Sequence, residues 1–184
     1  MKHLILGGAR SGKSRFAEEQ ALSLETRSKR KQLVYVATAT AGDNEMSERI
    51  QHHQQRREEQ SHKQQWQVIE EPLNLADVIL RFQEADHCVL IDCLTLWITN
   101  GLLSKQWPAR RQAFIEALQK SSATVLLVSN EVGSGVVPLG ELSRDFVDES
   151  GRLHQELASL CDQVTLVVAG LPLSLKSCST SPTP

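Results

Sequence analysis

The stretch GGARSGKS, from Gly7 to Ser14, is the strongest indication of the fold in this chain. It follows a short apolar run that ends at Leu6, and we expect a helix to begin near Lys13. The stretch fits the pattern G-x-x-x-x-G-K-[ST], in which successive backbone N–H groups converge on phosphate oxygens at a helix N-terminus. Because strand, turn and helix occur in the required order, the stretch predicts a nucleoside triphosphate site.

Each type of residue in this loop has an expected task. Lys13 should reach the β- and γ-phosphates, and the Ser14 hydroxyl should ligate Mg²⁺. The three glycines allow backbone angles and a close approach that a Cβ would obstruct. The expected phosphate-binding residues are Gly7, Gly8, Ala9, Arg10, Ser11, Gly12, Lys13 and Ser14.

Short apolar runs alternate with longer amphipathic stretches along the rest of the chain. The runs are apolar throughout, which is typical of strands covered on both faces in a parallel sheet. This alternation predicts a three-layer α/β domain with a mainly parallel sheet flanked by helices. Because the domain begins with the phosphate loop, it resembles a P-loop NTPase domain of the RecA-like type. The expected strands are His3–Leu6, Leu33–Ala37, Cys88–Asp92, Thr124–Ser129 and Val164–Ala169.

We expect a single domain over residues 1–171. The C-terminal end, residues 172–184, is rich in Ser, Thr and Pro towards its close and is expected to be disordered from about residue 176. Within the domain, Asn74 is expected to cap a helix that buries Leu75 and Ile79. Pro108 is well placed at the first position of another helix.

The composition is that of a soluble globular protein, with 184 residues, 40% of them apolar and 23% charged. The net charge of −2 gives no electrostatic reason to expect nucleic acid as a partner. No apolar run approaches the roughly 20 residues that span a bilayer, and no signal peptide is visible. The four cysteines lack C-x-x-C spacing, so we expect a reduced, cytoplasmic protein without a cysteine metal site.

An acid that organises Mg²⁺ is expected at the end of another strand. Asp92, which follows the run VLI, is the first candidate, although a capping or surface aspartate would look the same. Glu131 is a second candidate, because open α/β sheets bind ligands at the carboxyl ends of their strands. A GTPase switch would need an N-K-x-D motif, and the sequence contains none.

A pair of histidines, His52 and His53, lies in a polar segment among arginines. Arg49 precedes His53 by four residues and Arg57 follows it by four, so the three can share one helix face; His52 is flanked similarly by Arg49 and Arg56. Arginines would neutralise a triphosphate while a neutral imidazole attacks it. From spacing alone, a solvated helix face is the simpler explanation. No comparable surroundings are found at His3, His62, His87 and His154.

Several stretches together resemble one family over residues 3 to 171. They are GGARSGKS, VYVATAT, RIQHHQQRR, EEPLNL, VLIDCLTLWITN, SNEVGSGVVP and RDFVDESGRLHQELA. The family is the bifunctional adenosylcobinamide kinase / adenosylcobinamide-phosphate guanylyltransferase of cobalamin biosynthesis. The histidine segment and NEVGSGVVP make the resemblance specific, since the phosphate loop alone occurs in many families.

The resemblance implies two reactions. In the first, a nucleoside triphosphate, ATP or GTP, phosphorylates the aminopropanol hydroxyl of adenosylcobinamide. In the second, GTP guanylylates a histidine and the GMP passes to adenosylcobinamide phosphate, which gives adenosylcobinamide-GDP. The family pattern R-I-x-x-H-x-x-x-R places the guanylylated residue at His53, with His52 as the alternative. In the family a proline usually follows the position of Arg57, whereas Glu58 follows it here and the link to Trp66 is longer.

The resemblance also implies further nucleotide contacts, Mg²⁺ as the cofactor with Ser14 and Asp92 as its ligands, and a homo-oligomer, by family resemblance a trimer. The implied contacts are Thr38, Ala39, Thr40, Gln54, Gln55, Arg56, Arg57, Glu70 and Asp92. Two other functions stay open on the residues alone: a single-activity P-loop kinase for another small alcohol, and a nucleotide-gated binding module without turnover.

Overall fold

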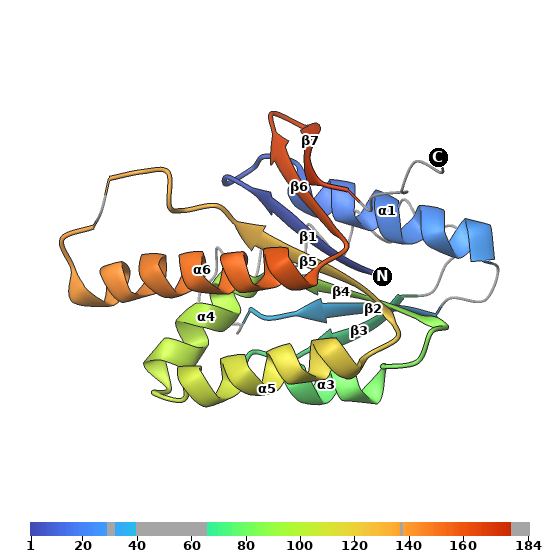
Figure 1. Ribbon diagram of the computed structural model, residues 1–184, viewed down its shortest axis with the longest axis horizontal. Helices are drawn as coiled ribbons and strands as arrows, with labels where there is room; N and C mark the ends of the chain where they lie inside the picture. The colour runs from blue at the N-terminus through green and yellow to red at the C-terminus, as the bar shows by residue number, and fades with distance from the viewer. Residues whose placement is uncertain (29–31, 40–65, 137, 178–184) are drawn as a thin grey trace, which may run out of the picture.

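The computed structural model describes residues 1–28, 32–39, 66–136 and 138–177. In these residues a seven-stranded sheet has the order β3-β2-β4-β5-β1-β6-β7 (Figure 1). All neighbouring strands are parallel except β7, which runs antiparallel to β6. The strands are β1 (Lys2–Gly7), β2 (Gln32–Ala37), β3 (Trp66–Glu70), β4 (His87–Asp92), β5 (Thr124–Asn130), β6 (Gln163–Val168) and β7 (Leu171–Lys176). The predicted α/β class with a mainly parallel sheet is confirmed.

Helices cover both faces of the sheet and make three layers. One face carries α1 (Lys13–Ser28), and the other carries α3 (Leu75–Arg81), α4 (Leu94–Leu103), α5 (Trp107–Lys120) and α6 (Glu141–Leu160) (Figure 1). Ile5 belongs to the apolar cluster under α1, whereas its neighbour Leu4 belongs to the larger cluster under the other helices. Successive residues of a strand point to opposite faces of the sheet. Because helices cover both faces here, both Leu4 and Ile5 lie in an apolar core.

The sequence did not predict two of these strands. Both lie at the edges of the sheet, and β3 is largely exposed while every residue of β7 is exposed, so neither carries the continuous apolar run of a central strand. Pro172 is tolerated in β7 because an edge strand need not use every N–H. The sheet therefore continues to Lys176, beyond residue 171 where the sequence placed the end of the domain.

The N-termini of α5 and α3 can be compared with the helix starts that the sequence predicts. Pro108 lies in the first turn of α5, where it is the second residue and not the first as expected. Asn74 precedes α3, but its side chain makes no capping hydrogen bond. Its Oδ1 instead accepts from Arg110 Nη1 at 2.5 Å, and Glu71 Oε1 accepts from the Asn74 backbone N–H at 2.7 Å. No helix in the described ranges is long and apolar enough to cross a membrane.

His3 is a buried polar residue in the central strand β1, and only 3% of it is exposed. Its Nε2 lies 2.8 Å from Thr165 Oγ1 on β6, and no hydrogen-bond partner for its Nδ1 is found among the described residues. Burial lowers the pKa of His3 from 6.5 to about 4, because a charged imidazolium would lose its hydration there.

We predict that this histidine makes the fold less stable in mild acid. Between pH 6.5 and about 4 the unfolded chain binds a proton that folded His3 refuses. The free energy of unfolding should therefore fall by about 1.4 kcal/mol per pH unit, or roughly 3 kcal/mol in all. Urea unfolding across this range should show the loss in the wild type, and His3→Gln should lack this part of the slope. Equal slopes in both proteins would contradict the prediction.

Candidate functional site

The strand register gathers most of the predicted site residues at one edge of the sheet. Gly7 at the end of β1 pairs with Asn130 at the end of β5. Ala37 at the end of β2 pairs with Glu70 on one side and with Asp92 on the other. Thr38 and Ala39 follow Ala37 directly. The phosphate loop, this turn and both acids thus lie at the same edge, as parallel strands require.

The phosphate loop forms a closed turn between β1 and α1. Ser11 N–H donates to Gly8 O at 3.3 Å, and Gly170 N–H, from the turn between β6 and β7, donates to Ser11 O at 2.8 Å. Arg10 in the middle of the loop has a left-handed backbone, with φ of 55°. The buried Ser11 Oγ has no hydrogen-bond partner within the described residues, which suits a loop whose polar groups serve phosphate oxygens.

Two of the three loop glycines are required by close backbone approach. A Cβ on Gly7 would lie 2.6 Å from Val167 O, and one on Gly12 would lie 3.2 Å from Gly170 Cα. Gly12 also has a φ of 94°, which side chains disfavour. A Cβ on Gly8 would meet nothing within 4 Å, so no contact within the described chain accounts for this glycine.

Lys13 lies under the loop with only 8% of its surface exposed. Its Nζ donates to Gly8 O at 3.1 Å, which holds the ammonium inside the turn. Burial lowers the pKa of Lys13, while the negative charge of nearby Asp92 acts in the opposite direction. A lysine with so little hydration is well suited to exchange a loop carbonyl for phosphate oxygens.

Asp92 ends β4, and its Oδ2 accepts from the Tyr35 hydroxyl at 3.1 Å. It lies close enough to Lys13 for their charges to interact, which places a carboxylate opposite the cation of the loop. Mg²⁺ at nucleotide sites takes one or two protein oxygens and completes its shell with phosphates and water. Ser14 and Asp92 fit such a site, although the described residues contain no cluster of three potential metal ligands.

A hydrogen-bonded clamp joins the turn after β2 to the residue after Asp92. Thr38 is fully buried; its hydroxyl donates to Cys93 O at 2.7 Å and accepts from Cys93 N–H at 3.0 Å. Asn100 Nδ2 on α4 lies within hydrogen-bond distance of Thr38 O, at 3.1 Å, and of Pro72 O, at 3.2 Å. These contacts tie the ends of β2, β3 and β4 together.

The edge also holds a histidine that sequence reasoning passed over. His154 on α6 lies with Nε2 2.8 Å from Ser129 Oγ of β5, and Glu131 follows the same strand. His154 and Glu131 are near enough for their charges to interact. The only signal was the place of His154 beside the apolar positions Leu153 and Leu157, and that pattern is typical of any amphipathic helix.

The remaining predicted residues lie outside the described ranges, so the structure does not place them. They are Thr40, Arg49, His52, His53, Gln54, Gln55, Arg56 and Arg57.

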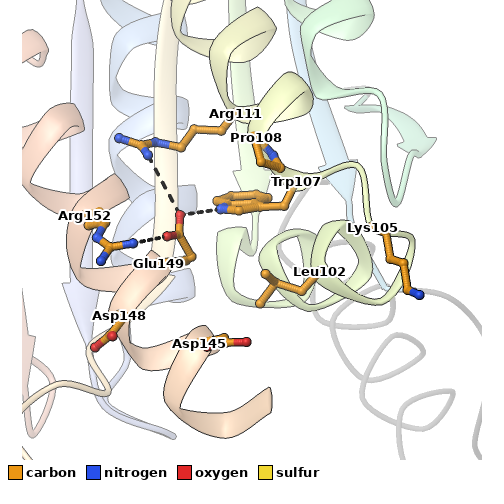
Figure 2. Close-up of a pocket in the computed structure, with 9 residues that line it drawn as sticks. All are labelled: Leu102, Lys105, Trp107, Pro108, Arg111, Asp145, Asp148, Glu149 and Arg152. Atoms are coloured by element: carbon orange, nitrogen blue, oxygen red, sulfur yellow. Dashed lines mark hydrogen bonds and ion pairs between the residues drawn. The ribbon is translucent and has the colours of Figure 1, made fainter. Parts of the chain in front are cut away.

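A pocket of about 450 Å³ opens between α4, α5 and the first half of α6 (Figure 2). Figure 2 shows Glu149 of α6 at its wall, accepting from Trp107 Nε1 at 2.6 Å and from Arg152 Nη1 at 2.5 Å. Arg111 Nη1 of α5 lies 3.8 Å from the same carboxylate. None of the predicted nucleotide residues that the structure describes lines this pocket. The Glu149 contacts fix α6 against α5, five residues before His154.

We predict that the Thr38 hydroxyl stabilises the edge of the sheet. Thr38→Val keeps the shape but leaves Cys93 N–H and O without their partner, so the free energy of unfolding should fall by about 2–3 kcal/mol. Thr38→Ser keeps the hydroxyl and should cost about 1 kcal/mol for the lost methyl group. Chemical denaturation measures both. Equal losses in the two variants would show that the hydroxyl has no such role.

Comparisons with known proteins agree with this geometry. The model of the cobinamide kinase / cobinamide phosphate guanyltransferase family matches residues 3–175. A bifunctional adenosylcobalamin biosynthesis protein, CobP, of Pseudomonas aeruginosa is 50% identical over 179 residues, which are 96% of this chain and 98% of that protein. The bifunctional adenosylcobalamin biosynthesis proteins CobU of Escherichia coli and of Salmonella typhimurium are each 38% identical over 192 residues, covering 96% of this chain and all of theirs. With its phosphate loop, its acids at the strand ends and this match along nearly its whole length, the chain belongs to the cobinamide kinase / cobinamide phosphate guanyltransferase family.

Proposed function

We propose that this chain catalyses both reactions of its family. It would phosphorylate the hydroxyl of adenosylcobinamide and then transfer GMP from GTP to adenosylcobinamide phosphate. The observation that carries this proposal is the phosphate loop with buried Lys13, placed opposite Asp92 in a chain that matches the family over residues 3–175. The substrates are then ATP or GTP together with a corrinoid alcohol and its phosphate.

In the kinase step the residues of this chain bind and orient the triphosphate. The loop N–H groups would surround the phosphates, and Lys13 would leave Gly8 O to neutralise charge on the β- and γ-phosphates. Mg²⁺, held by Ser14 and Asp92, would supply positive charge at the phosphate oxygens. Tyr35 holds the Asp92 carboxylate in place from the neighbouring strand.

The guanylyl step needs a nucleophile that attacks the α-phosphate. His53 is the residue proposed for this role, with Arg49 and Arg57 neutralising the triphosphate and His52 as the alternative nucleophile. An imidazole can attack directly, with pyrophosphate as the leaving group, and the phosphohistidine bond then passes GMP to the second substrate. Covalent catalysis of this kind splits one difficult displacement into two easier steps.

The other nucleotide contacts belong to the same proposal. Thr38, Ala39 and Thr40 would line the turn beside the nucleotide, Gln54 to Arg57 would follow the nucleophile, and Glu70 would approach the guanosine from the end of β3. The register supports the parts of this set that the structure describes, because Glu70 and Asp92 both pair with Ala37. A homotrimer is also proposed, on the family resemblance alone.

We predict that the protein becomes labelled when it is incubated with [α-³²P]GTP and Mg²⁺. The label should be acid-labile and stable in alkali, as a phosphohistidine bond is. His53→Ala should abolish the label while phosphorylation of adenosylcobinamide from [γ-³²P]ATP continues, because the kinase step has a different acceptor. His52→Ala is the matched control and should keep the label.

Each alternative has a distinct outcome in the same assay. Loss of label in His52→Ala but not in His53→Ala would move the nucleophile by one position. Kinase turnover without any label would indicate a single-activity kinase. Nucleotide binding without label or turnover would indicate a binding module and would refute the proposed function.

A further inference from the structure

Glu131 directly follows β5, a central strand of the sheet. Strand β5 lies between β1, which leads into the phosphate loop, and β4, which ends at Asp92. An acid that follows β5 therefore lies between the loop and the acid proposed to hold Mg²⁺. The Glu131 backbone N–H donates to Gly7 O at 3.1 Å, so this residue is tied directly to the first residue of the loop.

The Glu131 carboxylate is held at this place by its own loop. Its Oε1 accepts from Gly133 N–H at 2.8 Å. Burial raises the pKa of Glu131, but hydrogen bonds from Ser134 and Gly133 outweigh it, so that the pKa lies below its ordinary value; a proton on His154 would act in the same direction. The side chain is half-buried and ionised at neutral pH, and it is free of any ion pair to lysine or arginine in the described part of the chain.

His154 is the histidine whose charge would act on Glu131. It is half-buried on α6, and its Nε2 lies 2.8 Å from Ser129 Oγ, two residues before Glu131 on the same strand. Burial lowers the pKa of His154 and prevails over the Glu131 carboxylate, which acts in the opposite direction. The imidazole is therefore a neutral neighbour of Glu131 at neutral pH. Because Glu149 anchors α6 to α5, the position of His154 is set by the packing of the helix layer.

From this arrangement we infer that Glu131 is the general base of the kinase step and that His154, held against Ser129 of β5, is its positioning residue. This inference rests on the proposed function, since it assigns a role in the phosphorylation of the corrinoid hydroxyl. It differs from a role in holding Mg²⁺, which Asp92 supplies in the adjoining strand.

In the kinase step one bond to phosphorus forms, one breaks, and one proton is released. The substrate hydroxyl oxygen forms a bond to the γ-phosphorus as the bond to the β,γ-bridging oxygen breaks. The electron pair of that bond leaves with the nucleoside diphosphate. The hydroxyl proton passes to the Glu131 carboxylate and then to solvent, which returns the carboxylate for the next turnover.

Neither guanylyl step needs such a base. A neutral histidine attacks the α-phosphate of GTP through a lone pair, without a hydroxyl proton to remove. The second acceptor is a phosphate monoester, whose second pKa of about 6 leaves it largely ionised at neutral pH. Glu131 should therefore serve one of the two reactions, whereas a residue that binds the Mg²⁺–nucleotide would serve both.

The test is Glu131→Gln. The amide oxygen of the glutamine can still accept from Gly133 N–H, but the side chain cannot take the proton of the substrate hydroxyl. With adenosylcobinamide and [γ-³²P]ATP we expect kcat to fall about 100-fold or more with little change in the KM for ATP. Self-labelling with [α-³²P]GTP and GMP transfer to adenosylcobinamide phosphate should stay within about threefold of the wild type. Glu131→Asp should recover part of the lost kcat, because it restores the carboxylate.

His154→Gln tests the positioning role and should lower the kinase kcat by roughly 10-fold while both guanylyl reactions continue. Asp148→Asn, an exposed carboxylate on the same helix, is the matched control and should leave all three reactions unchanged. Unchanged kinase turnover in Glu131→Gln would overturn the inference, and so would a parallel loss of all three reactions. A wild-type protein that does not phosphorylate adenosylcobinamide would instead refute the proposed function.

Discussion

The parallel hydrogen-bond ladder between β1, β2, β3, β4 and β5 is the constraint on which the site depends. Parallel strands in register end at one edge, so the turns that follow them must meet there. Gly7 is therefore opposite Asn130, and Ala37 is opposite both Glu70 and Asp92. Residues separated by dozens of positions in the chain thus become neighbours because the backbone ladder places the ends of their strands side by side.

Strand β6 and the turn between β6 and β7 pack against the phosphate loop. Val167 O and Gly170 approach the loop so closely that Gly7 and Gly12 have no room for a Cβ, and Gly170 N–H donates to Ser11 O. The loop is consequently shaped in part by residues more than 150 positions further along the chain. Its buried Lys13 is kept in place by Gly8 O and lies near Asp92, which gives the loop a defined electrostatic arrangement.

The helix layer opposite α1 contributes a second set of constraints. Trp97, Trp107 and Phe114 pack together in its core, with Trp97 4.9 Å from Trp107 and 4.8 Å from Phe114 between ring centroids. Trp107 also donates to Glu149, so the same core fixes the axis of α6 and with it the place of His154 beside Ser129. Packing far from the phosphates thereby sets which side chains can act beside Glu131.

The amino-acid sequence was enough to predict the phosphate loop, the five buried strands, the fold class and the family. Each of these depends on residues that are close together in the sequence, either a glycine pattern with fixed spacing or the apolar run that a doubly covered strand requires. The edge strands β3 and β7, the clamp from Thr38 to Cys93, and the proximity of Glu131 and His154 became visible only in the folded chain. Edge strands lack the apolar signal because water reaches them, and contacts between distant residues have no sequence spacing that could reveal them.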